Sequence, residues 1–107
     1  MNVLLSKNAD DGYRTVLLDG DCDLYSAPSM RDAILALIAR GTRRLRLDFG
    51  KVGYLDSTGV GSIIRILHAM KAIGGTVVFR GLAGSPRKVL EYCNVISVMR
   101  LEEGDAA

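Results

Sequence analysis

Hydrophobic and polar residues alternate along this chain with two periods, one typical of strands and one typical of helices. Residues 44–49 read R-L-R-L-D-F, which is the period-two pattern of a strand with one face on the core and one face wet or only partly covered. Short segments rich in β-branched, aromatic or aliphatic residues predict three further strands. These lie at residues 3–5, 13–18 and 76–79. The polar segment 7–12 ends in Asp-Gly and predicts a hairpin-like reversal between the first two strands.

Between the later strands, apolar residues recur every three to four positions, which predicts helices. Ser26 with Pro28 is typical of a helix start, and Gly41 of a helix end. The helices are expected at residues 26–41, 58–73 and 87–92. Residues 19–25 are expected to form a polar loop, residues 95–101 fit either a strand or a short helix, and residues 102–107 are expected to be a frayed tail.

Strands that alternate with helices predict an α/β domain, because parallel strands need such crossovers. We expect one domain over residues 1–107, with a mixed sheet of four to five strands and helices mainly on one face. In the helix at 58–73 the apolar residues on one side are Val60, Ile63, Ile64, Leu67 and Met70. Ile66 and Ile73 fall at the margin of that arc, where their spacing favours core packing at least as much as contact with a partner.

Composition narrows the function classes. The chain has 107 residues, 49% hydrophobic and 24% charged, as expected of one ordinary globular domain. Its apolar runs are shorter than the ~18 residues that cross a bilayer, and its start does not resemble a secretory signal, so a cytoplasmic protein without membrane contact is expected. Cys22 and Cys93 have no C-x-x-C spacing, and His68 is the only histidine. A disulfide framework, a metal site or another cofactor is therefore not expected.

The basic cluster Arg40, Arg43, Arg44 and Arg46 is interpreted first as the solvated face of a strand. Binding of nucleic acid would need aromatic residues for base stacking or a known module, and only 6% of the chain is aromatic. No direct contact with nucleic acid is expected.

The segment 56–61, D-S-T-G-V-G, stands where the strand pattern gives way to a helix pattern. A helix N-terminus has unpaired N–H groups and a partial positive charge, so it accepts a carboxylate or a phosphate. Asp56, Ser57 and Thr58 are also all good N-cap residues, so from these residues alone ordinary capping is the favoured interpretation.

Two other functions fit this segment poorly. A nucleophilic Ser57 needs a base within hydrogen-bond reach, but His68 lies about 16 Å further along the same helix, and the G-x-S-x-G pattern is missing. Gly59-x-Gly61 lacks the Lys-Ser/Thr of a P-loop. The loop at residues 81–84 precedes a helix and keeps phosphate binding open as a weak alternative.

The order of these elements, together with D-L-Y-S-A-P at residues 23–28 and L-D-S-T-G-V-G at residues 55–61, resembles the STAS domain of anti-sigma-factor antagonists. Those proteins carry D-S-S/T-G-L-G at the equivalent helix start. This chain departs from that pattern at Val60, where leucine is usual, and at residues 20–23, G-D-C-D, where G-E-L/I-D is common. Neither departure removes a chemical group that the family's switch needs.

The resemblance implies a partner switch and no enzymatic activity. The unphosphorylated protein would bind an anti-sigma factor that is also a serine kinase, and so release a sigma factor for transcription. Phosphorylation of Ser57 would dissociate the complex, and a separate serine phosphatase would restore the binding form. The alternative is a STAS-like regulatory module of another partner-switching, nucleotide-sensing or lipid-sensing assembly.

The resemblance also implies roles for the residues around Ser57. Asp56 would fix the loop or the geometry of the phosphoacceptor, and Asp23 would line the same surface. Thr58 would cap the helix. Gly59 and Gly61 would let a partner backbone approach closely, and Ile66 and Ile73 are candidate contacts on the same helix.

Overall fold

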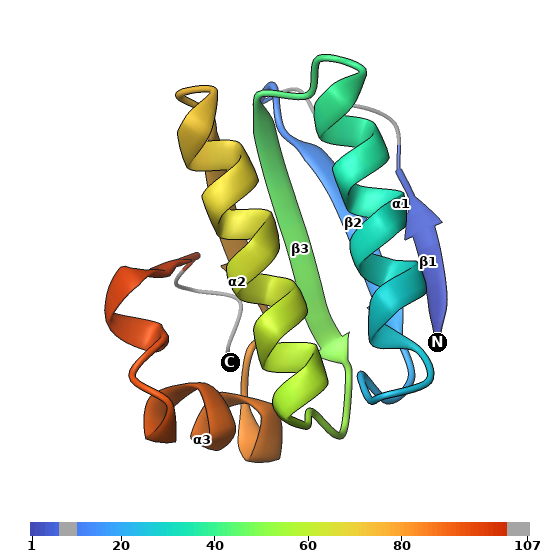
Figure 1. The fold of residues 1–107 in the computed structure, drawn as a ribbon, viewed down its shortest axis with the longest axis vertical. Helices are drawn as coiled ribbons and strands as arrows, with labels where there is room; N and C mark the ends of the chain where they lie inside the picture. Colours follow the sequence, from blue (N-terminus) through green and yellow to red (C-terminus); the bar gives the residue numbers. More distant parts are fainter. Residues whose placement is uncertain (7–10, 103–107) are drawn as a thin grey trace.

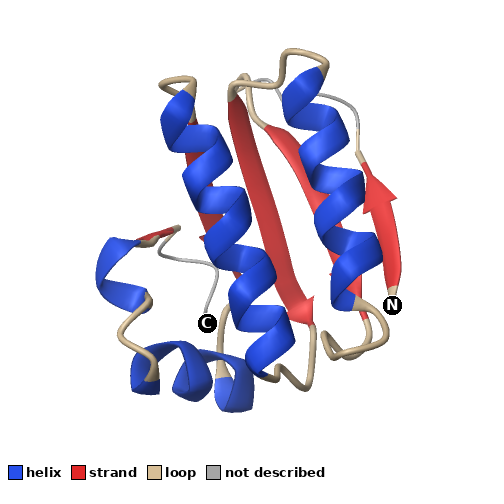
Figure 2. Ribbon diagram, viewed as in Figure 1, coloured by secondary structure: helices blue, strands red, loops and turns tan. Residues whose placement is uncertain are grey.

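The computed structural model describes residues 1–6 and 11–102, which form a five-stranded sheet with two long helices packed on one face (Figures 1 and 2). The elements follow in the order β1 (Asn2–Leu5), β2 (Arg14–Asp19), α1 (Ala27–Ala39), β3 (Arg44–Lys51), α2 (Ser57–Ala72), β4 (Thr76–Arg80), α3 (Gly84–Tyr92), the 3₁₀ turn η1 (Ile96–Val98) and β5 (Arg100–Leu101).

The strands lie in the sheet in the order in which they follow along the chain. β1 pairs with β2 in antiparallel fashion, and the pairs β2–β3, β3–β4 and β4–β5 are parallel. Right-handed crossovers that all step in one direction bring their helices to the same face, so α1 and α2 lie side by side there (Figure 2). The predicted mixed sheet, with helices mainly on one face, is confirmed. The hairpin reversal joins β1 to β2 as expected, but residues 7–10 of its predicted turn lie outside the described residues.

The alternation at residues 44–49 predicts the inner face of β3 correctly. Leu45, Leu47 and Phe49 are buried against the helices, and the Phe49 ring lies 5.8 Å from that of Phe79 on β4. The prediction for α2 needs correction. Ile66 is fully buried in the core, whereas Ile64 and Leu67 are only half-buried. α2 packs on α1 as well as on the sheet, so its buried arc is wider than a single sheet contact would require and is rotated toward Ile66.

The opposite face of the sheet is also corrected. Arg46 was expected on a solvated face, but only 5% of it is exposed. Its guanidinium donates to Glu102 Oε2 at 2.7 Å and to Thr15 Oγ1 at 3.0 Å, and it also forms an ion pair with Asp11. Glu102 was assigned to the frayed tail, yet its other oxygen accepts from Arg80 at 2.6 Å. These charges cover a face that has no helix.

Two local expectations change at the ends of elements. Ser26 occupies the N-cap position of α1, but its side chain makes no capping bond and donates to the Asp21 carbonyl at 2.6 Å. The Asp23 carboxylate accepts from the backbone N–H groups of Tyr25 and Ser26 and so stabilises the turn before the helix, while α1 itself has no side-chain cap. The ambiguous segment 95–101 contains both predicted structures, since η1 is followed directly by β5.

Candidate functional site

The candidate site lies where the carboxyl ends of β2 and β3 lead into α1 and α2, at the lower end of the molecule in Figure 1. The loops that follow the two strands are hydrogen-bonded to each other. The Cys22 N–H donates to the Tyr54 carbonyl at 2.9 Å, and the Asp56 N–H donates to the Cys22 carbonyl at 3.2 Å. Leu55 is buried and anchors the second loop in the core. The segment around Ser57 is therefore held by the sheet that precedes it.

Asp56 is the N-cap of α2 and also joins the two loops. Its Oδ1 accepts from the Gly59 N–H at 3.0 Å, and its Oδ2 accepts from the Leu24 N–H at 3.0 Å. This geometry agrees with the expectation that Asp56 fixes the loop. It contradicts the expectation for Thr58, because Asp56 supplies the cap and Thr58 lies one residue inside the helix.

Ser57 is the first residue of α2 and is exposed. Its hydroxyl makes no hydrogen bond with any described residue. The Gly59 and Val60 N–H groups are both taken by Asp56, so the first N–H groups of the helix, at Ser57 and Thr58, keep their donor capacity toward solvent. A phosphate on Ser57 would therefore stand in a favourable local field at this helix end.

The two glycines of the segment have different surroundings. A Cβ on Gly59 would lie 2.7 Å from the Cys22 carbonyl oxygen, so this glycine is needed for α2 to pack inside the domain. The expectation that Gly59 makes room for a partner backbone is therefore replaced by an internal role. Gly61 is exposed and has open space around its Cα, so it stays a candidate contact.

The remaining residues predicted for the site also divide into buried ones with an internal role and exposed ones that stay candidate contacts. Ile66 is 0% exposed, so the expected partner contact there is wrong, whereas Ile73 at the C-terminal end of α2 is partly exposed. Asp23 precedes Leu24, which donates to Asp56, so Asp23 belongs to the same joined pair of loops. Hydrogen bonds from the Ser26 and Tyr25 N–H groups hold the pKa of the Asp23 carboxyl below its ordinary value.

Three exposed apolar side chains in these loops were missed by the sequence analysis. Leu24 is 60% exposed, Tyr25 87% and Tyr54 49%. All three lie on the two loops that are joined at Asp56, because the Leu24 N–H donates to that carboxylate and the Tyr54 carbonyl accepts from the Cys22 N–H. Large apolar residues inside a loop otherwise rich in aspartate were the available signal. Exposed aromatic and aliphatic side chains of this kind are typical anchors of protein–protein interfaces.

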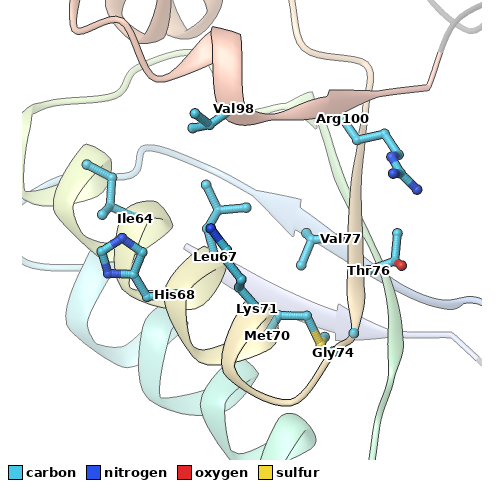
Figure 3. A pocket seen from close by; sticks show the side chains of 11 residues that line it. Ile64, Leu67, His68, Met70, Lys71, Gly74, Thr76, Val77, Val98 and Arg100 are labelled. Carbon is cyan, nitrogen blue, oxygen red and sulfur yellow. The ribbon is translucent and has the colours of Figure 1, made fainter.

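The described residues provide little for catalysis at this end of the molecule. No group of three metal-ligating side chains occurs among them. Cys22 is buried, and burial raises the pKa of its thiol to about 11. His68 lines a groove of about 530 Å³ between the C-terminal half of α2 and strands β4 and β5, together with Leu67, Lys71 and Val98 (Figure 3). That groove lies on the part of α2 remote from Ser57.

This arrangement combines the parallel strands β2–β5 with an exposed serine at the start of α2, and it defines a domain of the STAS type. The family described as "Mlab, STAS domain" matches residues 5–101, so the chain belongs to the STAS domain family. Among the described residues, no helix is long and apolar enough to cross a membrane.

Individual relatives agree with this assignment. The chain is 24% identical over 104 residues to the anti-sigma-B factor antagonist of Staphylococcus aureus (strain NCTC 8325 / PS 47), which covers 97% of this chain and 96% of that protein. An anti-sigma factor antagonist from Mycobacterium paratuberculosis superposes with a TM-score of 0.79 at 23% identity, over 95% of this chain and 85% of that one. The phosphorylated form of SpoIIAA, a Bacillus cell fate determinant, superposes with a TM-score of 0.72 at 19% identity, over 96% and 93% of the two chains.

Proposed function

We propose that this STAS domain is an anti-sigma-factor antagonist that binds an anti-sigma factor through the surface around Ser57, and that phosphorylation of Ser57 ends this binding. The observation that carries the proposal is the position of the Ser57 hydroxyl, exposed at the first turn of α2 and without a described hydrogen-bond partner. The relatives named as anti-sigma-B factor antagonists cover nearly the whole chain and support the same class of partner.

The proposed surface combines apolar anchors with the phosphorylation site. Leu24, Tyr25 and Tyr54 would contribute most of the binding free energy, since exposed aromatic side chains bury much area at little entropic cost. Asp56 would act by holding the two loops in one arrangement. Asp23 and Gly61 would lie at the edge of the contact. Thr58 flanks Ser57 and would be shielded from the kinase by its place within the helix.

Phosphorylation would act locally. A phosphate adds about −1.5 to −2 charges at pH 7, and at its own helix N-terminus that charge is tolerated. Across a close interface the same group adds bulk, desolvation cost and charge beside the Asp56 carboxylate. A loss of only ~3 kcal/mol would weaken binding about a hundredfold. SpoIIAA matches this chain in both its unphosphorylated and phosphorylated forms, with TM-scores of 0.74 and 0.72, so in that protein the fold persists with the phosphate in place.

The kinase would be the anti-sigma factor itself, and a separate serine phosphatase would reverse the reaction. In this scheme the domain is a substrate and performs no chemistry. Partners that control transcription place its action in the cytoplasm.

The test is incubation with the kinase-type anti-sigma factor of the same organism and ATP, followed by intact-mass measurement. We expect one phosphoryl group on the parent protein and on the control variants Thr58→Ala and Ser85→Ala, and none on Ser57→Ala. A phosphate that persists in Ser57→Ala would refute the site. Ser57→Asp should lose binding to the anti-sigma factor while its free energy of unfolding changes by less than about 0.5 kcal/mol; a Ser57→Asp variant that binds normally would refute the mechanism.

A further inference from the structure

A pocket lined by four arginines lies at the end of the sheet opposite to Ser57, where the strands β2 and β3 begin. Helix α1 also ends there, at the upper end of the molecule in Figure 1. Its volume is about 450 Å³, and its lining consists of Gly12, Arg14, Arg40, Gly41, Thr42, Arg43 and Arg44. We call this the arginine pocket. A volume of this size lies within the range of small-molecule sites.

The charges of this pocket are unbalanced within the described part of the chain. None of the lining residues that the structure describes is acidic. The nearby Asp11 and also Glu102 form ion pairs with Arg46, and Asp32 forms one with Arg31. None of the four pocket arginines forms an ion pair with a described residue. Guanidinium groups gathered without counter-charges repel one another, and an anion bound among them would remove that repulsion.

Arg14 supplies an independent observation. It shares the helix-covered side of β2 with the buried residues Val16 and Leu18. Its Nε is buried and has no hydrogen-bond partner among residues 1–6 and 11–102. Buried N–H donors in proteins are nearly always satisfied, so this atom lacks an acceptor that an oxyanion in the pocket would provide.

The backbone around the pocket is fixed before any ligand arrives. The last turn of α1 is closed by the Gly41 N–H on the Ile38 carbonyl at 3.0 Å and the Thr42 N–H on the Leu37 carbonyl at 3.1 Å. Gly41 adopts a φ of +109°, which favours glycine at such a helix end. The Arg43 carbonyl accepts from the Thr76 N–H at 2.8 Å, which ties the loop to β4. Only the exposed side chains of Arg40, Arg43 and Arg44 have to move to enclose a ligand.

The lining selects the class of ligand. Arg40, the C-cap of α1, offsets the partial negative charge at that end of the helix. Arg14, Arg43 and Arg44 lie outside that helix, on β2, before β3 and on β3. Guanidinium groups bind phosphate oxygens in paired hydrogen bonds, and several of them suit several phosphates. The described lining residues include no large apolar or aromatic side chain, so the recognised part is the anion and not an apolar body. We propose that the arginine pocket binds the phosphate groups of a small molecule that carries a chain of two or more of them.

The experiment is a titration of the full chain with inorganic tripolyphosphate, followed by calorimetry and by the NMR resonance of the Arg14 Nε–H. An ionic strength of about 0.15 M screens diffuse attraction beyond ~8 Å. We expect saturable binding, a shift of the Arg14 Nε–H resonance, and much weaker binding of orthophosphate. Arg43→Gln/Arg44→Gln should weaken binding at least about tenfold. The control Arg65→Gln/Arg87→Gln removes the same charge outside the pocket and should bind like the parent.

Each other result overturns the proposal. Equal weakening in the two double variants would show diffuse charge attraction, and equal affinity for orthophosphate would show that a chain of phosphates is not recognised. The proposal also fails if tripolyphosphate leaves the Arg14 Nε–H resonance unchanged, or if only phosphatidylglycerol vesicles or single-stranded RNA bind. Because all four arginines are remote from Ser57, Ser57→Ala should bind tripolyphosphate normally, so failure of the anti-sigma proposal and failure of this one are separable.

Discussion

The backbone N–H of Leu24 donates to Oδ2 of Asp56 at 3.0 Å, although the two residues are 32 positions apart in the chain. The other oxygen of the same carboxylate caps α2 through the Gly59 N–H. One side chain therefore sets the start of the helix that carries Ser57 and the position of the loop that carries Leu24 and Tyr25. A partner that touches both loops meets a surface arranged before binding.

Asp56→Ala should destabilise the domain by about 2 kcal/mol, because it removes an N-cap and a second hydrogen bond. Thr58→Ala, two residues after Asp56, should change the free energy of unfolding by less than about 0.5 kcal/mol. Urea unfolding of both variants measures this difference. An equal loss in Thr58→Ala would mean that Thr58 contributes to the cap after all.

The glycines 59 and 61 form a matched pair. Gly59→Ala should cost about 1–3 kcal/mol, because the new methyl group meets the Cys22 carbonyl oxygen at 2.7 Å and the helix has to shift. Gly61→Ala meets nothing within 4 Å and should stabilise α2 by up to about 1 kcal/mol through helix propensity. Chemical denaturation of both variants tests the assignment, which fails if Gly59→Ala is neutral.

The ion pair between Asp11 and Arg46 predicts a dependence of stability on pH. The hydrogen bond from Arg46 lowers the pKa of the Asp11 carboxyl, so this carboxyl stabilises the folded state fully above its unfolded pKa of about 3.9. That contribution is lost as the pH falls through the lower pKa of the folded state. Asp11→Asn should therefore be less stable than the parent at pH 7, and the difference should shrink below about pH 4.

Urea unfolding at pH 7, 5 and 3 measures the effect of Asp11→Asn. Asp32→Asn is the control, because Asp32 pairs with Arg31 at an exposed position of α1 and such pairs contribute little. A difference between parent and Asp11→Asn that stays constant down to pH 3 would contradict the assigned role of this ion pair.

Two exposed tyrosines separate partner binding from stability. Tyr25 is 87% exposed beside the candidate site, and Tyr92 is 93% exposed at the end of α3. Neither Tyr25→Ser nor Tyr92→Ser should change the free energy of unfolding by more than about 0.5 kcal/mol. Tyr25→Ser should weaken binding to the anti-sigma factor at least about tenfold, as expected for an aromatic side chain that becomes buried in the interface. Calorimetric titration with the partner is the measurement, and equal affinities of the two variants would remove Tyr25 from the surface.

The sequence by itself determined the elements and the class of fold. The alternation at residues 44–49 identified the central strand, and the order of strands and helices implied parallel crossovers with helices on one face. It also placed Ser57 where a loop becomes a helix, because residues that favour N-caps cluster only at particular points of an amphipathic pattern. Each of these features depends on residues that are close together in the chain, so the local pattern of residues is enough to predict it.

The tertiary structure alone decided which side chains face one another. The buried arc of α2 includes Ile66, and α2 packs on α1 as well as on the sheet. The periodicity of one helix contains no information about such a neighbour. Gly59 lies against Cys22, and Arg46 lies between Asp11 and Glu102. Each of these contacts joins segments more than 30 residues apart. Long-range packing fixes such pairs, so they followed from the arrangement of the sheet and not from any local pattern.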